Sequence, residues 1–277
     1  MESPSALAAA VAADLENIRR QAPLVLSLTN SVVQPITANL LLAIGAVPAM
    51  LNDAQEAVEM LRAGASGLLV NVGTVTSDQG VTMLAAVKAA GELGIPWVLD
   101  PVAVGLLTLR TELSKQLAGY SPRLIRGNAS EIMAMAGYAA ATKGPESTCA
   151  STDAVQAAKE LALRTGAAVL VTGVTDYATD GDKVIAVGNG HAMMSRVTGV
   201  GCAMGALAAA CAAVAPTALQ AAVSTAVLLG IAGETAHEQS RGPGSFAVSL
   251  LDCLDALTQE QIERQARIAI TQQRQKA

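Results

Sequence analysis

The sequence predicts an α/β protein built on a doubly wound, mostly parallel sheet with helices on both faces. Hydrophobic residues make up 52% of the chain and aromatic residues only 2%, so the core is aliphatic and alanine-rich, which suits helices packed closely on a sheet. Short apolar runs recur along the chain, as is typical of parallel strands buried on both faces. Helical patterns separate these runs, and this alternation predicts the fold class.

Five apolar runs are expected to be the parallel strands: PLVLSL at 23–28, GLLV at 67–70, PWVL at 96–99, RLI at 123–125 and AAVLV at 167–171. Three helical patterns end in glycine: AQEAVEMLRAG has Gly64 in the C-cap position, TMLAAVKAAGELG ends at Gly94, and DAVQAAKELALRTG ends at Gly166. Glycine is common at this position because it adopts the left-handed backbone conformation without strain.

The pattern changes after Gly173. DYAT, DGD and KVIAV predict a β-hairpin that turns at Asp180 and Gly181. The stretch 193–197 is expected to be a strand, and CAMGALAAACAAV a helix. From Gly199 onward the chain is expected to be mostly helical up to TQEQIERQARIAITQQRQKA, where Thr258 and Gln261 suggest a capping box.

No repeat or low-complexity linker divides the chain, so residues 1–277 are expected to form one domain. KGPESTCAST at 143–152 is expected to be a polar loop. Residues 197–233 carry no formal charge, which raises the possibility of a membrane span, but Pro216 divides the stretch and two buried helices explain it better.

Composition also limits the partners. A net charge of -5 and a pI near 5.1 provide no basic surface for nucleic acid or an anionic membrane, so neither is expected as a partner. The N-terminus does not have the pattern of a signal peptide, because Glu2 stands where positive charge is expected and Asp14 and Glu16 interrupt the apolar stretch. This favours a cytoplasmic location. The four cysteines are widely spaced without a CxxC pair, which argues against a zinc site or a disulfide framework: Cys149, Cys202, Cys211 and Cys253.

Small polar residues follow each predicted parallel strand. They are Thr29 and Asn30, Asn71 and Gly73, Asp100, Asn128, and Thr172 and Gly173. Ligands of open α/β sheets bind outside the carboxyl ends of the strands, so these residues are expected to surround a site. Taken singly, each is better explained as a residue that starts a turn.

TGVG at 198–201 precedes a predicted helix, and helix N-termini present unpaired N–H groups that bind anions. The spacing is not that of a dinucleotide-binding loop, because Met204 occupies the third glycine position. A Walker sequence is absent from the chain. Gly199 and Gly201 are therefore expected to bind a phosphate or another anion, although glycine-rich turns also serve tight helix packing.

Cys202 lies in the first turn of the predicted helix. The field at a helix N-terminus favours the thiolate, so the sequence predicts a lowered pKa and a sulfur able to accept a proton. The alternative is an inert cysteine in an alanine-rich helix, which is the interpretation given to Cys211 and Cys253.

The sequence resembles hydroxyethylthiazole kinase of thiamine salvage, a ribokinase-like family, from about residue 20 to about residue 265. The segments that carry the resemblance are SLTNSVVQPITANLLLAIGAVPAM (27–50), LLVNVGTVT (68–76), VLDPVAVG (98–105), IRGNASEI (125–132), VTGVTD (171–176), VTGVGC (197–202) and GPGSF (242–246). Cysteine at position 202, where many ribokinase relatives have an aspartate base, is characteristic of the thiazole kinases.

The resemblance implies phosphorylation of the primary hydroxyl of 4-methyl-5-(2-hydroxyethyl)thiazole by ATP. It places Cys202 at the substrate hydroxyl and the amides of Gly199 and Gly201 around the transferred phosphoryl group. Met50 and Gly199 would contact the thiazole, and Asn30 would help to position it. The residues implied at ATP are Arg126, Thr172 and Asn128.

Asp100 and Glu131 are the candidates for binding Mg²⁺, since both follow strands and Asn128 with Glu131 matches the family's N-x-x-E element. Glu131 is equally well explained by a capping box with Asn128. Two residues depart from the family pattern: Val200 replaces a smaller residue or threonine, and Ala103 replaces a glycine.

The family resemblance further implies a homotrimer with its sites between subunits. Alternative functions are phosphorylation of another small alcohol, of the hydroxymethylpyrimidine or pyridoxal type, and inactive binding of a thiazole or nucleotide. His191 and His237 show no triad or metal spacing and are expected to be structural.

Overall fold

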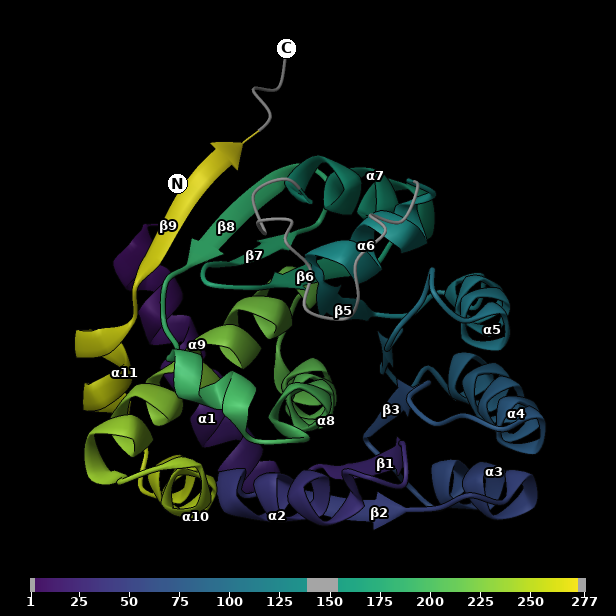
Figure 1. The fold of residues 1–277 in the computed structure, drawn as a ribbon, viewed down its shortest axis with the longest axis horizontal. Coiled ribbons are helices and arrows are strands. Elements are labelled where there is room, and N and C mark those ends of the chain that lie inside the picture. The colour runs from purple at the N-terminus through teal and green to yellow at the C-terminus, as the bar shows by residue number, and fades with distance from the viewer. Residues whose placement is uncertain (1–2, 139–153, 274–277) are drawn as a thin grey trace.

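The computed structural model describes residues 3–138 and 154–273 (Figure 1). Its strands form one nine-stranded sheet in the order β2-β1-β3-β4-β5-β6-β7-β8-β9. The parallel strands are β1 (Leu24–Leu28), β2 (Val47–Met50), β3 (Gly67–Asn71), β4 (Trp97–Asp100), β5 (Leu124–Asn128) and β6 (Ala168–Thr172). The antiparallel strands are β7 (Asp176–Thr179), β8 (Lys183–Val187) and β9 (Ile268–Gln273). The predicted fold class and hairpin are thereby confirmed.

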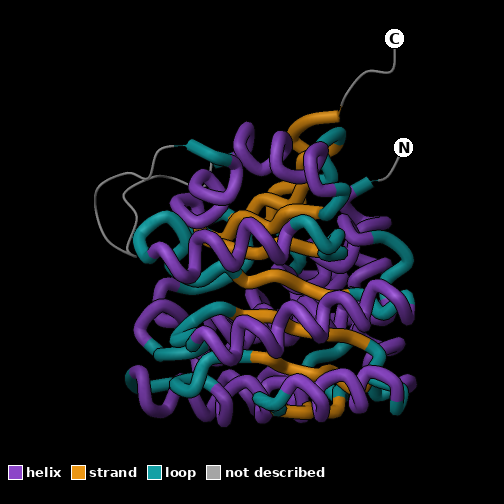
Figure 2. Tube along the Cα trace, turned by 90° about the vertical axis from the view of Figure 1, so that its right-hand side faces the viewer, coloured by secondary structure: helices purple, strands orange, loops and turns teal. Residues whose placement is uncertain are grey.

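Helices cover both faces of the sheet (Figures 1 and 2). One face carries α1 (Pro4–Gln21), α2 (Gln34–Ile44), α8 (Val200–Val214), α9 (Ala218–Gln239), α10 (Pro243–Asp255) and α11 (Gln259–Gln265). The other carries α3 (Ala54–Arg62), α4 (Ser77–Leu93), α5 (Thr108–Ala118), α6 (Ala129–Ala136) and α7 (Val155–Thr165). Each face has its own aliphatic core, because alternate residues of the central strands point to opposite sides.

The uncharged stretch before residue 233 forms two buried helices, α8 and α9, as predicted, with Pro216 in the turn between them. Within the described part of the chain, α9 is the one helix long and apolar enough to cross a membrane, and 78% of its most apolar window is buried. That burial is typical of a core helix, and α8 packs against α9 and the central strands.

Two local predictions are wrong. Residues 192–196 form a short 3-10 helix, η1, instead of a strand, because no strand pairs with them and His191 Nδ1 accepts a bond from the Met193 N–H. Helix α3 ends at Arg62, so Gly64 (φ +111°) follows the C-cap instead of forming it. The chain after Gly199 is mostly helical, as predicted, up to the end of α11 at Gln265, and β9 then pairs with β8.

Strand β2 was not expected from the sequence, whereas the caps at Gly94 and Gly166 and the Thr258–Gln261 capping box are confirmed. The polar stretch 143–152 and Cys149 lie outside the described residues.

Candidate active site

The polar residues that follow the parallel strands meet at one edge of the sheet, as predicted. The register pairs Asn71 with Asp100, and Asn128 with Thr172, on adjacent strands. Since the strands run in the same direction, their carboxyl ends must share this edge. The N-terminus of α8 reaches the same edge, because Cys202 contacts Asn30.

A chain of buried side chains links these strand ends. Asn30 Nδ2 donates to Asn71 Oδ1 at 3.0 Å and to Cys202 Sγ at 3.4 Å. Asn71 Nδ2 in turn donates to Asp100 Oδ2 at 2.7 Å, and Arg126 Nη1 lies 3.5 Å from the same oxygen. The structure thus brings together four predicted site residues through Asn71, a strand-end residue that the sequence placed at this edge without a role of its own.

The glycine loop begins α8 as predicted. Gly199 is the N-cap with φ +93°, and no side chain caps this helix end. The first N–H groups of an α-helix have no intrahelical acceptor, so those of Gly201 and Cys202 are available to an anion. A Cβ on Gly201 would lie 3.5 Å from Arg126 Nη2, which means that the loop and the guanidinium face each other.

Cys202 does not have the lowered pKa that the sequence predicted. Burial raises the pKa of its thiol to about 11, and the nearby Asp100 adds to the effect, while Asn71, Arg126 and Asn30 oppose it. The prediction is wrong because the sulfur is largely removed from water, which disfavours the charged thiolate. At neutral pH this residue is a thiol.

Asp100 is completely buried, and burial raises its pKa to about 7 against the opposing influence of Arg126. Its Oδ2 has two partners, whereas its Oδ1 is buried without a hydrogen bond. A buried carboxylate oxygen without a partner is unfavourable, and a bound cation or donor would satisfy it.

Glu131 forms the capping box. Its Oε2 accepts from the Asn128 N–H at 2.9 Å, and Asn128 Oδ1 accepts from the Glu131 N–H at 3.0 Å. Its Oε1 accepts from the Ala103 N–H at 2.9 Å. Each carboxylate oxygen therefore holds a backbone group, which confirms the structural alternative and keeps Glu131 beside the β4–α5 turn. Within residues 3–138 and 154–273, no three acidic, histidine or cysteine residues gather as a metal-binding group.

Arg126 and Thr172 lie side by side on β5 and β6. Arg126 Nη2 is 3.2 Å from Thr172 Oγ1, which donates to the Gly127 carbonyl. Asp176 also faces Arg126, and its Oδ1 accepts from the Gly173 N–H at 2.9 Å. Burial raises the pKa of Asp176 to about 6. No pattern in the sequence pointed to Asp176, although the VTGVTD segment contains it.

A cavity of about 470 Å³ opens beside the loop. It is lined by Arg126, Thr172, Gly173, Val174, Asp176, Asn189, Gly190, His191, Ala192, Met194, Ser195, Val200, Gly201, Met204, Ala226, Leu229 and Gly230. Met50 is not in this lining: it lies at the end of the edge strand β2, opposite Ser27, and is half-buried. A second cavity, of about 490 Å³ at the ends of α5, α6 and α7, contains none of the predicted site residues.

The two residues that depart from the family pattern both lie near the site. Val200 is buried and lines the cavity. Ala103 has φ +60°, a conformation in which glycine is less strained, and its N–H binds Glu131. His191 and His237 stack with their ring centroids 3.5 Å apart.

An open α/β sheet with an uncapped helix N-terminus, an arginine and a cavity at its carboxyl edge is the arrangement expected of a small-molecule phosphotransferase of ribokinase-like fold. The chain belongs to the hydroxyethylthiazole kinase family, whose family model matches residues 15–260.

Relatives match over nearly the whole length. A hydroxyethylthiazole kinase of Akkermansia muciniphila is 72% identical over 267 residues, which are 96% of this chain and 98% of that protein. One of Leptospira interrogans serovar Lai is 48% identical over 247 residues, covering 89% and 93% of the two chains.

Solved structures agree with this assignment. The structure of a hydroxyethylthiazole kinase from Pyrococcus horikoshii OT3 has a TM-score of 0.86 and 38% identity, and covers 95% of this chain and 99% of that one. Bacillus subtilis pyridoxal kinase, in an ADP complex, has a TM-score of 0.56 over 76% of this chain and 91% of its own, at 16% identity, and so shares the fold alone.

Proposed function

We propose that this enzyme transfers the γ-phosphoryl group of ATP to the primary hydroxyl of 4-methyl-5-(2-hydroxyethyl)thiazole. The family assignment supports this substrate. The observation that carries the chemistry is that Gly201, in the uncapped first turn of α8, lies beside the Arg126 guanidinium, and that both residues line the cavity. Positioning and charge neutralisation supply most of the catalysis of phosphoryl transfer, and this arrangement can provide both.

Each side chain has a role in this proposal. Arg126 and Thr172 hold the phosphates of ATP beside Asn128, since a guanidinium binds phosphate oxygens directionally. Met50 and Gly199 contact the thiazole ring, and a thioether packs well on such a ring. Asn30 fixes the Cys202 sulfur, which orients the acceptor hydroxyl.

Mg²⁺ fits this site at Asp100, whose Oδ1 is buried without a partner. Asp100 and Glu131 are the residues that would hold it, with Glu131 contributing through lone pairs that its two backbone contacts leave free. A few oxygen ligands completed by water and phosphate are usual for this ion. When bound, it neutralises phosphate oxygens.

Subunit assembly and location complete the proposal. A homotrimer with the sites between subunits would cover the free edge of β2, where Val47 is exposed and Met50 is half-buried. We propose that the chain forms one kinase domain, since all described strands belong to one sheet. The enzyme would act in the cytoplasm.

The test is a coupled ATPase assay with Mg²⁺ and a panel of alcohols: the thiazole alcohol, a hydroxymethylpyrimidine and pyridoxal. We expect the highest kcat/KM with the thiazole alcohol. A preference for another alcohol refutes the substrate, and ATP binding without turnover of any alcohol supports an inactive binder.

The anion-binding role of the loop is tested with Gly201→Asp. A carboxylate at this position would repel the phosphoryl group, so the rate should fall severely, by about a hundredfold or more. An added Cβ at Gly201 would be in ordinary van der Waals contact with the end of the Arg126 side chain, at 3.5 and 3.7 Å, so the fold should survive, as circular dichroism can show. An unchanged rate would rule out this role.

A further inference from the structure

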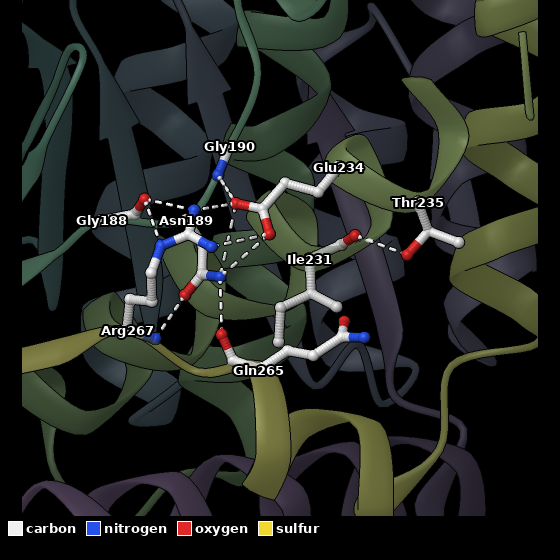
Figure 3. A network of polar contacts seen from close by, with 8 residues as sticks. All are labelled: Gly188, Asn189, Gly190, Ile231, Glu234, Thr235, Gln265 and Arg267. Atoms are coloured by element: carbon white, nitrogen blue, oxygen red, sulfur yellow. Dashed lines mark hydrogen bonds and ion pairs between the residues drawn. The ribbon is translucent and has the colours of Figure 1, made fainter. Parts of the chain in front are cut away.

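A polar cluster away from the loop at Gly199–Cys202 joins three segments that are distant in the chain (Figure 3). We call it the Glu234 clamp; its members are Gly188, Asn189, Gly190, Glu234, Gln265 and Arg267. Glu234, on α9, accepts from the Gly190 N–H at 2.6 Å and from Asn189 Nδ2 at 3.3 and 3.4 Å. The short segment after β8 is therefore fastened to α9 through one carboxylate.

Arg267, at the start of β9, fastens the same segment from the other side. Its guanidinium forms an ion pair with Glu234 and donates to the Gly188 carbonyl from Nε at 3.0 Å and from Nη2 at 2.6 Å. Its main-chain N–H donates to Asn189 Oδ1 at 2.8 Å, and Asn189 Nδ2 also donates to the Gln265 carbonyl at 3.0 Å. Asn189 thus has both ends of its amide occupied within the clamp.

The clamped segment continues as one wall of the 470 Å³ cavity, which we call the 189–195 wall. It rests directly on α9 at two glycines. A Cβ on Gly230 would lie 2.6 Å from Asn189 Cβ, and one on Gly233 would lie 2.7 Å from Met194 Sδ. The wall and α9 are therefore in close contact, and the clamp lies at the start of this contact.

The cavity lining has a cationic part and an apolar part. Arg126 and Gly201 provide the cationic, N–H-rich part that suits phosphates. Met194, together with Ala226 and Leu229 of α9, provides apolar surface next to the 189–195 wall. A nucleotide has the same division, with an anionic tail and a flat base that favours apolar contact.

We propose that Glu234 and Arg267 are positioning residues for the nucleotide base: they hold the 189–195 wall where it packs against the base. Neither residue lines the cavity, so each acts through the wall. The inference rests on the proposed use of ATP. Residues 265 and 267 lie beyond the stretch 15–260 that matches the family model, so two of the six clamp residues are outside the matched region.

The test uses Glu234→Gln and Arg267→Met in the full chain. Both side chains are partly exposed, 21% and 55%, so neither substitution leaves a charge in a dry core. We expect KM for ATP to rise about three- to thirtyfold, the range by which such network substitutions change coupling, with kcat and KM for the alcohol unchanged.

Direct binding measurements distinguish an effect on binding of the base from an effect on binding of the phosphates. Calorimetry should show that AMP binding weakens by a similar factor in both variants, while inorganic tripolyphosphate binds as in the wild type. The matched control is Arg264→Met, which removes an arginine of neighbouring α11 whose ion pair is with the exposed Glu260 at 3.9 Å. It should change neither KM nor AMP binding.

Two results overturn the inference. If the unfolding midpoint falls but KM for ATP and AMP binding do not change, the clamp is only a structural brace. If tripolyphosphate binding weakens as much as AMP binding, the clamp acts on the phosphate loop and not on the base. A wild-type protein that binds AMP but phosphorylates none of the alcohols refutes the proposed function alone, because weaker AMP binding in the variants still supports the clamp.

Discussion

Substituting Gly199 by alanine tests whether the loop before α8 has room for any side chain. Gly199 has φ +93°, and an added Cβ would lie 2.7 Å from Ile36 Cγ2 and 3.0 Å from Val33 Cγ1. The left-handed conformation costs a non-glycine residue about 1–2 kcal/mol. Overpacking adds about 1–3 kcal/mol, and the smaller entropy of the unfolded chain offsets about 0.4–1 kcal/mol. The free energy of unfolding should therefore fall by about 1–5 kcal/mol.

Two other glycines separate these contributions. Gly64 has φ +111° with no atom within 4 Å of an added Cβ, so Gly64→Ala retains the backbone strain without the overlap and should destabilise by at most about 1.6 kcal/mol. Gly91 lies in α4 with an ordinary φ and open space, so Gly91→Ala should stabilise by about 0.5–1 kcal/mol.

Urea unfolding of the three variants, followed by fluorescence of the single tryptophan, Trp97, gives the comparison. Phosphorylation by Gly199→Ala should also slow, because the residue immediately precedes the N–H groups assigned to the phosphoryl group. If Gly199→Ala and Gly64→Ala lose the same stability within about 0.5 kcal/mol, the contact with Ile36 and Val33 is not tight and the reasoning fails.

Three further predictions follow from the site. Cys202→Asp should preserve or raise kcat, since a carboxylate can orient the hydroxyl and also accept its proton, and inactivity with retained substrate binding would show that this position requires the thiol. Ala103→Gly should relieve the strain at φ +60° and raise the free energy of unfolding by up to about 1 kcal/mol in urea unfolding, whereas a loss would show that this backbone is not strained. Asp176→Asn tests pH dependence. The pKa of Asp176 is about 6 in the folded protein against an ordinary 3.8, so the stability that the protonated carboxyl contributes is fully present below pH 4 and is lost as pH rises through 6. The variant should therefore gain stability relative to the wild type between pH 4 and pH 8, by at most about 3 kcal/mol, and a constant difference would contradict the shift.

The elements that the sequence predicted are those specified by local patterns. The central strands are continuous apolar runs, and the β7–β8 hairpin has Asp180 and Gly181 at its turn. The missed strands depend on distant partners: β2 has four residues including Pro48, and β9 is a mixed polar segment that pairs with β8 across about eighty residues of chain. Likewise, residues 192–196 have no strand beside them and form η1 instead.

The location of the site could be predicted because parallel strands place their carboxyl ends at one edge whatever the details of packing. Its electrostatics could not be predicted. The pKa of Cys202 depends on burial and on Asp100, which is more than a hundred residues away in the chain. Asp176 was missed because its role depends on facing Arg126 from the hairpin, which no local spacing indicates.

The raised pKa of Cys202 changes the part that its side chain can play at the substrate hydroxyl. The sulfur accepts a bond from Asn30 Nδ2, which leaves the S–H free to donate. A substrate oxygen that accepts this S–H has its own proton free to point at the phosphoryl oxygens. Phosphoryl transfer passes through a loose transition state in which the attacking oxygen needs little activation, so the proton can leave late. Under the proposed function, a thiol that orients the hydroxyl is then sufficient, and the Asn30–Asn71–Asp100 chain would hold it in place.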